Sequence, residues 1–258
     1  MADSTRRATN SVQSIERAFS LLELLATGGG ARSLSELSAA SGLAPATIHR
    51  LMGTLIERGY VRRASDRRYL LGPRLIALGD QAGRAFGTWA TQHLRELVEL
   101  TGETANLAVL EGDHVLYVAQ APGKHAMRMF TEPGRRVEPH CTAVGKAMLA
   151  RLDDATVRAI LERTGMERHT ATTLTKPNAL LAQLAKIREQ GYALDDGEQE
   201  VGVRCVAVAL DQGPSLTAIS VSGPLARLTD QALKLIVPAL DQVAKSLSAE
   251  LESSDRAR

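Results

Sequence analysis

Four arginines gather around one predicted turn, and this makes the segment a candidate for binding an anion. They are Arg62, Arg63, Arg67 and Arg68. Residues 60–63 and 67–71 have the composition of strands, and the intervening 64–66 predicts a hairpin turn. Cations gathered at a hairpin tip repel one another unless an anion lies between them, so a phosphate backbone would be a suitable partner. The alternative is a solvated surface hairpin that binds no anion. The elements that precede the hairpin decide between these two interpretations.

The segment before this hairpin predicts a helix whose polar face suits the major groove of DNA. Between Pro45 and Gly59 the apolar residues that would face inward are Ile48, Leu51, Met52 and Leu55. The opposite face would present three candidate DNA-binding side chains, Thr47, His49 and Arg50. Arg50 could fork to guanine or to phosphate, and Thr47 could bond a phosphate or contact a thymine methyl.

Two further predicted helices precede this one and complete a helix-turn-helix. The first begins near residue 12, and its rhythm predicts a buried face made of Val12, Ile15, Phe19, Leu22 and Leu25. Residues 28–30, all glycine, would end it. Ser33 and Glu36 form a capping-box pattern that starts the second helix, whose buried stripe would be Leu34, Leu37 and Ala40. Three such helices followed by a hairpin predict a winged helix-turn-helix, and this context favours DNA as the partner of the arginines.

The charge distribution also points to a nucleic-acid partner at the N-terminal end. The formal net charge is +2, but residues 1–80 hold eleven Arg against seven Asp and Glu, so this part carries +4 and the rest −2. Arginine is the side chain best suited to bidentate contacts with phosphate and guanine. A GC-rich genome would also favour arginine, so the pattern supports the helix-turn-helix prediction without carrying it.

The composition is that of an ordinary water-soluble protein. A length of 258 residues allows two domains, 44% of the residues are apolar and 23% are charged. No apolar run approaches the ~20 residues of a membrane span, and residues 1–10 lack the apolar core of a secretory signal. We therefore expect a cytoplasmic protein. Cys141 and Cys205 are the only cysteines and show no C-x-x-C spacing, so we expect no disulfide framework, no metal site and no cofactor.

The remaining chain predicts a connecting helix and then an antiparallel α+β domain. Residues 73–86 carry an apolar stripe made of Leu75, Ile76, Leu78 and Ala82. Further helices are expected at residues 89–100, 153–164, 177–190 and from 229 onward. Two hairpins are expected, pairing 105–110 with 114–120 and 203–210 with 216–222. Strands grouped in hairpins with helices between them indicate an antiparallel sheet.

Polar residues on the second hairpin could line a small cavity. Ser220 and Ser222 share one face of a predicted strand, and Cys205 lies on the neighbouring strand. Two hydroxyls and a thiol at strand ends would suit a small polar ligand. Ordinary polarity of an edge strand is the alternative.

An enzyme is a rival hypothesis, because His140 adjoins Cys141 and a Cys-His hydrolase uses these two residue types. On an extended segment, however, adjacent side chains point to opposite faces, so these two would not form a nucleophile–base pair. The common hydrolase, zincin and P-loop motifs do not occur in the sequence. We therefore do not expect an enzyme.

Several segments, taken in order, resemble the isocitrate-lyase-regulator (IclR) family. The N-terminal ones are residues 14–18, 34–37, 43–51 and 59–61, and the C-terminal ones are 139–147, 191–198, 202–205 and 219–224. The resemblance implies a DNA-binding domain over residues 11–72, a linker helix over 73–87 and a GAF-like effector-binding domain over 88–252. Ala46 departs from the serine that is frequent in the family, so a phosphate contact there would pass to Thr47.

The resemblance also implies an effector site. Small-carboxylate sensors of this family use backbone N–H groups at the positions of Ala143 and Val144. They also use side chains at the positions of Asp195, Cys205, Ser220 and Ser222. Asp195 would repel an anion unless it is protonated or accepts a hydrogen bond from a ligand hydroxyl, so a hydroxylated or hydrated acid fits better than a plain fatty acid.

These observations predict a DNA-binding transcription regulator, more often a repressor than an activator. We expect a dimer or a dimer of dimers, paired through the 73–86 helices and bound to an inverted-repeat operator, with operator affinity modulated by a small carboxylate or oxo-acid. A Cys-His hydrolase and a DNA-binding protein without a ligand are the alternatives.

Overall fold

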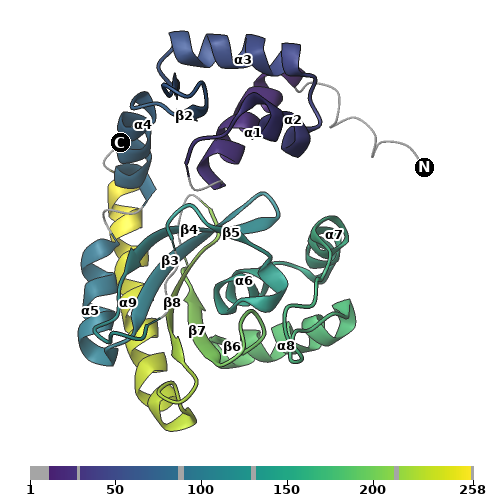
Figure 1. The fold of residues 1–258 in the computed structure, drawn as a ribbon. Helices are drawn as coiled ribbons and strands as arrows, with labels where there is room; N and C mark the ends of the chain where they lie inside the picture. The colour runs from purple at the N-terminus through teal and green to yellow at the C-terminus, as the bar shows by residue number, and fades with distance from the viewer. Residues whose placement is uncertain (1–11, 28–29, 87–89, 129–131, 212–214, 257–258) are drawn as a thin grey trace. The chain divides into compact units, whose positions relative to one another are not determined.

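The computed structural model describes residues 12–27, 30–86, 90–128, 132–211 and 215–256 (Figure 1). The chain divides into two compact units, residues 1–82 and 83–258. Helix α4 (Arg74–Phe86) occupies the predicted connecting segment, so it begins in the first unit and ends in the second.

Three helices form the body of the first unit. They are α1 (Gln13–Thr27), α2 (Leu34–Ser41) and α3 (Pro45–Glu57). The capping box at Ser33 is present, because its hydroxyl accepts from the N–H of Glu36 while the Glu36 carboxylate accepts from the N–H of Ser33. Gly42 ends α2 in the left-handed conformation. The helix-turn-helix predicted from the sequence is therefore present, and Ile48 and Met52 of α3 are buried as expected.

The predicted inner face of α1 is partly wrong. Val12, Ile15 and Phe19 are 57%, 54% and 60% exposed. The residues that α1 buries are Leu21 and Leu25. Apolar residues cover more than one side of this helix. The spacing of apolar residues therefore predicted a buried face that lies partly outside the unit's own core. In α2, Ala40 is exposed although Leu37 is buried.

The predicted wing is a two-stranded antiparallel hairpin. Strands β1 (Val61–Arg63) and β2 (Tyr69–Leu71) pair with Val61 opposite Leu71. Arg67 has a φ of 68°, an unfavourable conformation for a residue with a side chain, and it lies where the hairpin turns back. Val61 and Tyr69 point into the core of the unit and so fix the wing against the helices.

The second unit is built on a six-stranded antiparallel sheet (Figure 1). Its strands are β3 (Thr104–Glu111), β4 (His114–Ala121), β5 (Arg136–Val137), β6 (Ala193–Asp196), β7 (Val203–Ala209) and β8 (Thr217–Pro224), in the order β5-β4-β3-β8-β7-β6. Both predicted hairpins, β3–β4 and β7–β8, are present. The pairing of β8 with β3 places β8 in the interior of the sheet, so Ser220 and Ser222 are not edge-strand residues.

Helices cover both faces of this sheet. On one face lie α5 (Thr91–Thr101) and α9 (Asp230–Arg256), and the opposite face carries α6 (Ala143–Leu149), α7 (Asp154–Thr164) and α8 (Pro177–Gln190). A separate apolar core lies between each face of the sheet and the helices that cover it. The unit is therefore an α+β domain. Within the described residues, no helix is long and apolar enough to cross a membrane.

The segment that precedes α6 differs from the sequence expectation. Pro139–Cys141 form a short 3₁₀ turn rather than an extended segment. Strand alternation therefore does not separate His140 from Cys141, and the expected extended geometry is wrong. The two side chains are instead kept apart by hydrogen bonds to different partners, Glu167 and Gln199.

Candidate functional site

The outer face of α3 presents the three side chains expected to contact DNA. His49 and Arg50 are exposed, Thr47 is half-buried, and Ile48 between them is fully buried. Helix α3 begins without a side-chain cap, because Ala44 precedes Pro45 and offers no hydroxyl. Arg50 is exposed on the face of α3 opposite the buried Ile48, where a guanidinium can reach bases or phosphates.

The four wing arginines are all exposed but differ in their surroundings. Arg68 donates to Asp66 with Nε 2.8 Å from the carboxylate, and Arg63 lies over the Tyr69 ring at 5.6 Å. Among the described residues, no ion pair involves Arg62 or Arg67. Asp66 therefore offsets part of the repulsion among the four arginines. Arg62 and Arg67 are the two that are more available to bind an anion.

The six residues of the predicted effector site all line one cavity in the second unit. These are Ala143 and Val144 at the start of α6, Asp195 on β6, Cys205 on β7, and Ser220 and Ser222 on β8. Cys205 lies opposite both Asp195 and Ser222 in the strand register, so these three share one face of the sheet. The cavity measures about 20 Å³, space for about one water molecule, and a larger ligand requires it to open.

A polar row crosses the sheet face behind this cavity. Asn106 of β3 donates from Nδ2 to the hydroxyls of Ser220 at 3.4 Å and Ser222 at 3.3 Å. Its own carbonyl accepts from Gln120 Nε2 at 3.2 Å. Ser220, Ser222 and Asn106 are at most 3% exposed. Because each serine oxygen accepts from Asn106, each hydroxyl keeps its proton to donate, which suits an anionic ligand.

The Asp195 carboxylate is held by the loop that follows β6. Its Oδ1 accepts from the backbone N–H groups of Glu198 at 2.7 Å and Gln199 at 3.3 Å. Burial raises the pKa of Asp195 to about 6, although the bond from Glu198 and the charge of Lys146 lower it. At neutral pH the group is therefore mainly ionised, but it takes up a proton about two pH units more readily than an exposed aspartate.

A buried ion pair fixes the same loop from the other side. Lys146 of α6 is fully buried and donates from Nζ to Glu198 Oε1. Burial raises the pKa of Glu198, and the charge of Lys146 opposes this. The second oxygen, Glu198 Oε2, has no hydrogen-bond partner among the described residues. The pair thus joins α6 to the loop that carries the Asp195 contacts.

His140 and Cys141 do not form a catalytic pair. His140 Nε2 lies 3.0 Å from the carbonyl oxygen of Glu167, and Cys141 donates from Sγ to Gln199 Oε1 at 2.9 Å. Burial raises the pKa of the Cys141 thiol to about 12 and lowers the pKa of His140. A protonated thiol without a bonded base is not an activated nucleophile, so the geometry does not support the hydrolase hypothesis.

Several functional candidates escaped the sequence reasoning. The cavity is also lined by Tyr117, Thr142, Gln199, Glu200 and Val203, and its serines depend on Asn106. Asn106 lies in an apolar run predicted as a strand. A buried amide at such a position needs a hydrogen-bond partner, and this signal in the sequence could have identified Asn106. Tyr117 is half-buried, and the desolvation of its phenol raises the pKa, so it remains a hydrogen-bond donor.

Comparison with known proteins gives one consistent family. Residues 86–249 match the model of the bacterial transcriptional regulator IclR C-terminal domain, and residues 14–65 match the IclR helix-turn-helix domain. The transcriptional repressor IclR of Escherichia coli K12 is 36% identical over 236 residues, which cover 89% of this chain and 86% of that protein. These matches include both units of the structure.

Solved structures similar to this chain indicate the same family. An IclR transcriptional regulator from Silicibacter sp. TM1040 superposes with a TM-score of 0.81 at 32% identity, covering 92% of this chain and 96% of that one. An IclR homologue from Microbacterium hydrocarbonoxydans, crystallised with 4-hydroxybenzoate, has a TM-score of 0.78 at 22% identity and covers 93% and 99% of the two chains. The chain is thus a transcriptional regulator rather than an enzyme, and it belongs to the IclR family.

Proposed function

We propose that this regulator binds an inverted-repeat operator as a dimer or a dimer of dimers, represses transcription there, and changes its DNA affinity when a small carboxylate enters the second unit. The observation that carries the proposal is the meeting of Ala143, Val144, Asp195, Cys205, Ser220 and Ser222 around one cavity. Repression is the sign of regulation named for the E. coli relative.

The DNA contacts divide between α3 and the wing. Arg50 is exposed on the outer face of α3 and is positioned to contact base edges in a major groove. Arg62 and Arg67 extend from a two-stranded hairpin and are suited to phosphates on either side of that groove. Thr47 is half-buried near the helix start, where phosphate contacts are common, and Ala46 offers no hydroxyl.

Dimerisation is supported by an apolar groove in the first unit. The groove measures about 770 Å³, and its apolar lining residues include Ile15, Phe19, Leu51, Leu55, Leu75 and Leu78. Phe19 is 60% exposed, and on α4 Ile76 and Leu78 are 66% and 54% exposed. Exposed apolar surface of this extent marks an interaction site. A second copy of α4 is the partner proposed here, because pairing two winged units lets two half-sites be bound together.

The effector chemistry follows from the donors around the cavity. The serine hydroxyls, the Tyr117 phenol and the N–H groups at the start of α6 suit a carboxylate. Asp195 suits a hydroxyl on the same ligand, since its carboxylate can accept from it. The 4-hydroxybenzoate bound by the M. hydrocarbonoxydans homologue is such a hydroxylated acid. The present cavity of about 20 Å³ must expand for any such ligand, which supplies the conformational change that regulation needs.

A thermal-shift screen with small carboxylic acids tests the ligand part of the proposal. Binding to the native state raises stability by RT ln(1 + [L]/Kd), so a hydroxy acid should raise the melting temperature and its amide analogue should not. A regulator without any ligand would show no shift with any acid. DNA from upstream of the regulator's own gene, in a gel shift at moderate salt, tests operator binding separately.

A further inference from the structure

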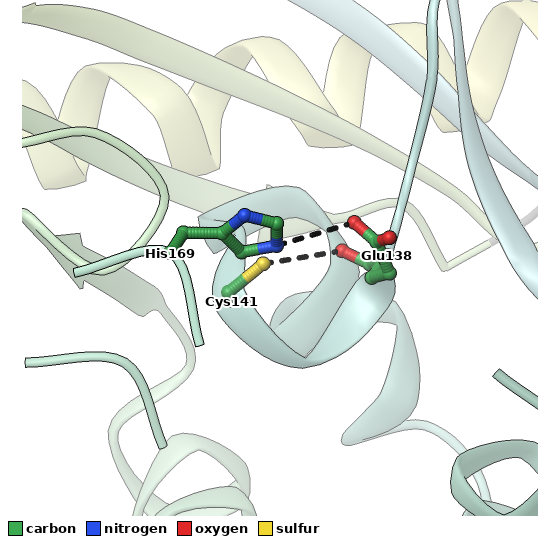
Figure 2. Close-up of side chains that lie close together, drawn as sticks. All are labelled: Glu138, Cys141 and His169. Atoms are coloured by element: carbon green, nitrogen blue, oxygen red, sulfur yellow. Dashed lines mark hydrogen bonds and ion pairs between the residues drawn. The ribbon is translucent and has the colours of Figure 1, made fainter. Parts of the chain in front are cut away.

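Three side chains of metal-ligand type lie together in the second unit. Glu138, Cys141 and His169 each offer one ligand atom, and these atoms all lie within 4.8 Å of one another (Figure 2). Among the described residues, this is the only group of three histidine, cysteine and acidic side chains close enough to share an ion. The cluster belongs wholly to the second unit, and none of its residues lines the candidate effector cavity.

Two chain segments supply the cluster, and both are held in place without an ion. Glu138 directly precedes the 3₁₀ turn and Cys141 is its last residue, and positions three apart in such a turn lie on the same side. His169 lies on the connection between α7 and α8, and its N–H donates to Thr173 Oγ1 at 3.1 Å. His140 fastens the connection to the turn through its 3.0 Å contact with the Glu167 carbonyl. The ligand atoms are thus brought together by backbone contacts that do not depend on the cluster itself.

The cluster is partly open to solvent. The Cys141 thiol is buried, whereas the His169 and Glu138 side chains are 23% and 28% exposed. His169 Nε2 lies 3.5 Å from Glu138 Oε2, and the Cys141 sulfur donates to the backbone carbonyl of Glu138 at 3.8 Å (Figure 2). An ion could therefore enter from the solvent side and meet the sulfur last.

The chemistry of the three ligands selects the metal. Thiolate, imidazole and carboxylate are the ligand types of zinc, whereas magnesium and calcium prefer oxygen alone. Tetrahedral bonds of 2.0–2.3 Å place ligand atoms about 3.3–3.8 Å apart, so the Glu138–His169 separation of 3.5 Å already fits. No separation among the three ligand atoms exceeds 4.8 Å, so at most about 1 Å of closure is needed, which a rotamer change of the Glu138 side chain can provide.

We propose that Glu138, Cys141 and His169 bind one Zn²⁺ ion, with water in the fourth position. Binding converts the Cys141 thiol to a thiolate and releases its proton to solvent. The ion would tie the α7–α8 connection to the turn that leads into α6. It would also remove the S–H donated to Gln199 Oε1, and Gln199 lines the effector cavity. Zinc is therefore expected to change the hydrogen bonding of that cavity wall.

Cobalt substitution in the tag-free, full-length protein tests the site, because Co²⁺ takes the same ligands and reports a thiolate through a near-ultraviolet charge-transfer band. The metal-stripped protein is titrated with Co²⁺, and Zn²⁺ is then added as the competitor. We expect one Co²⁺ per chain, a charge-transfer band, and loss of that band on addition of Zn²⁺. Cys141→Ser should abolish the band, whereas Cys205→Ser, which changes the other cysteine of the chain, should keep it.

A histidine pair provides the matched control. His125 Nε2 lies 3.8 Å from Glu103 Oε1 and resembles the His169–Glu138 pair, but it belongs to no three-ligand group among the described residues. Loss of an outer partner of a metal ligand costs about 10–100-fold in affinity, so His169→Gln should weaken zinc binding by at least that factor. His125→Gln should leave zinc affinity unchanged. Circular dichroism verifies that each variant folds.

A protein without a charge-transfer band at saturating Co²⁺ has no thiolate site, and the cluster is then a histidine–glutamate ion pair beside a packed cysteine. A band that survives Cys141→Ser, or zinc affinity that is equal in His169→Gln and His125→Gln, would place the metal elsewhere and overturn the proposal. None of these readouts depends on DNA or on an effector, so they are independent of the function proposed above.

Discussion

The buried carboxyl of Asp195 predicts a specific pH dependence of stability. Asp195 is 2% exposed, and its pKa rises from 3.8 to about 6, mainly because of burial. Since the folded state holds the proton more tightly than the unfolded state, the free energy of unfolding contributed by this group falls as pH rises from about 4 to about 6. Each pKa unit corresponds to 1.36 kcal/mol, so the shift amounts to about 3 kcal/mol.

Asp195→Asn removes this titration while its amide oxygen can still accept from the Glu198 N–H. We expect the variant and the parent to have similar stability near pH 4, where Asp195 is protonated. Near pH 7 the variant should be more stable by up to about 3 kcal/mol. Urea-induced unfolding of the full-length protein, followed by circular dichroism at both pH values, measures the difference.

Asp196→Asn is the matched control, because Asp196 is the next residue of β6 but has an exposed side chain. Its difference from the parent should vary little with pH, since it exchanges only a partly exposed contact with Arg204. A stability difference for Asp195→Asn that is the same near pH 4 and pH 7, or a parent that is the more stable protein near pH 7, would refute the reasoning.

Further predictions concern the buried ion pair, the DNA contacts and the dimer. Lys146→Met should lower the free energy of unfolding by about 3–5 kcal/mol, because it leaves Glu198 charged and buried, and adding Glu198→Leu should restore most of the loss in urea unfolding. If the double variant is as unstable as the single one, the loss does not come from an uncompensated charge. Arg50→Ala should remove about 1–3 kcal/mol of discrimination between operator and other DNA. Arg67→Ala should instead weaken both alike and flatten the slope of log K against log salt by about 0.9, whereas an unchanged slope would remove the wing from the interface. Phe19→Glu combined with Ile76→Glu should produce monomers in light scattering, while Leu235→Glu, which changes an even more exposed leucine of α9, should not; a parent that is monomeric at working concentration would exclude the proposed dimer.

Local signals explain which elements of the fold could be predicted. The capping box at Ser33 and the helix between Pro177 and Gly191 were identified because the signal and the structure involve the same few residues. The inner face of α1 was partly misassigned, because Phe19 and Leu21 are both apolar and only tertiary packing chooses between them. The 3₁₀ turn at His140 also carries no periodicity long enough to be recognised.

The residues of the candidate cavity also divide into those that the sequence could predict and those that it could not. Ser220, Ser222 and Cys205 could be assigned to shared strand faces from alternation, and the family resemblance added Ala143, Val144 and Asp195. The partners Asn106 and Lys146 could not be assigned, because each acts across the sheet or between α6 and a loop. Such pairings depend on strand register and helix placement, which a single sequence does not specify. The Glu138, Cys141 and His169 cluster was missed for the same reason, since its residues come from two separated segments.

The most direct test of the account is the effect of a cavity ligand on operator binding. An acid found by thermal shift is added to labelled DNA from upstream of the regulator's own gene, and fluorescence anisotropy gives the operator Kd with and without it. For the parent, we expect the acid to change Kd by about 5–150-fold, the usual range of allosteric coupling. Ser222→Ala should bind the operator as the parent does but lose most of this response. A Ser222→Ala protein that responds to the acid as fully as the parent would contradict the account.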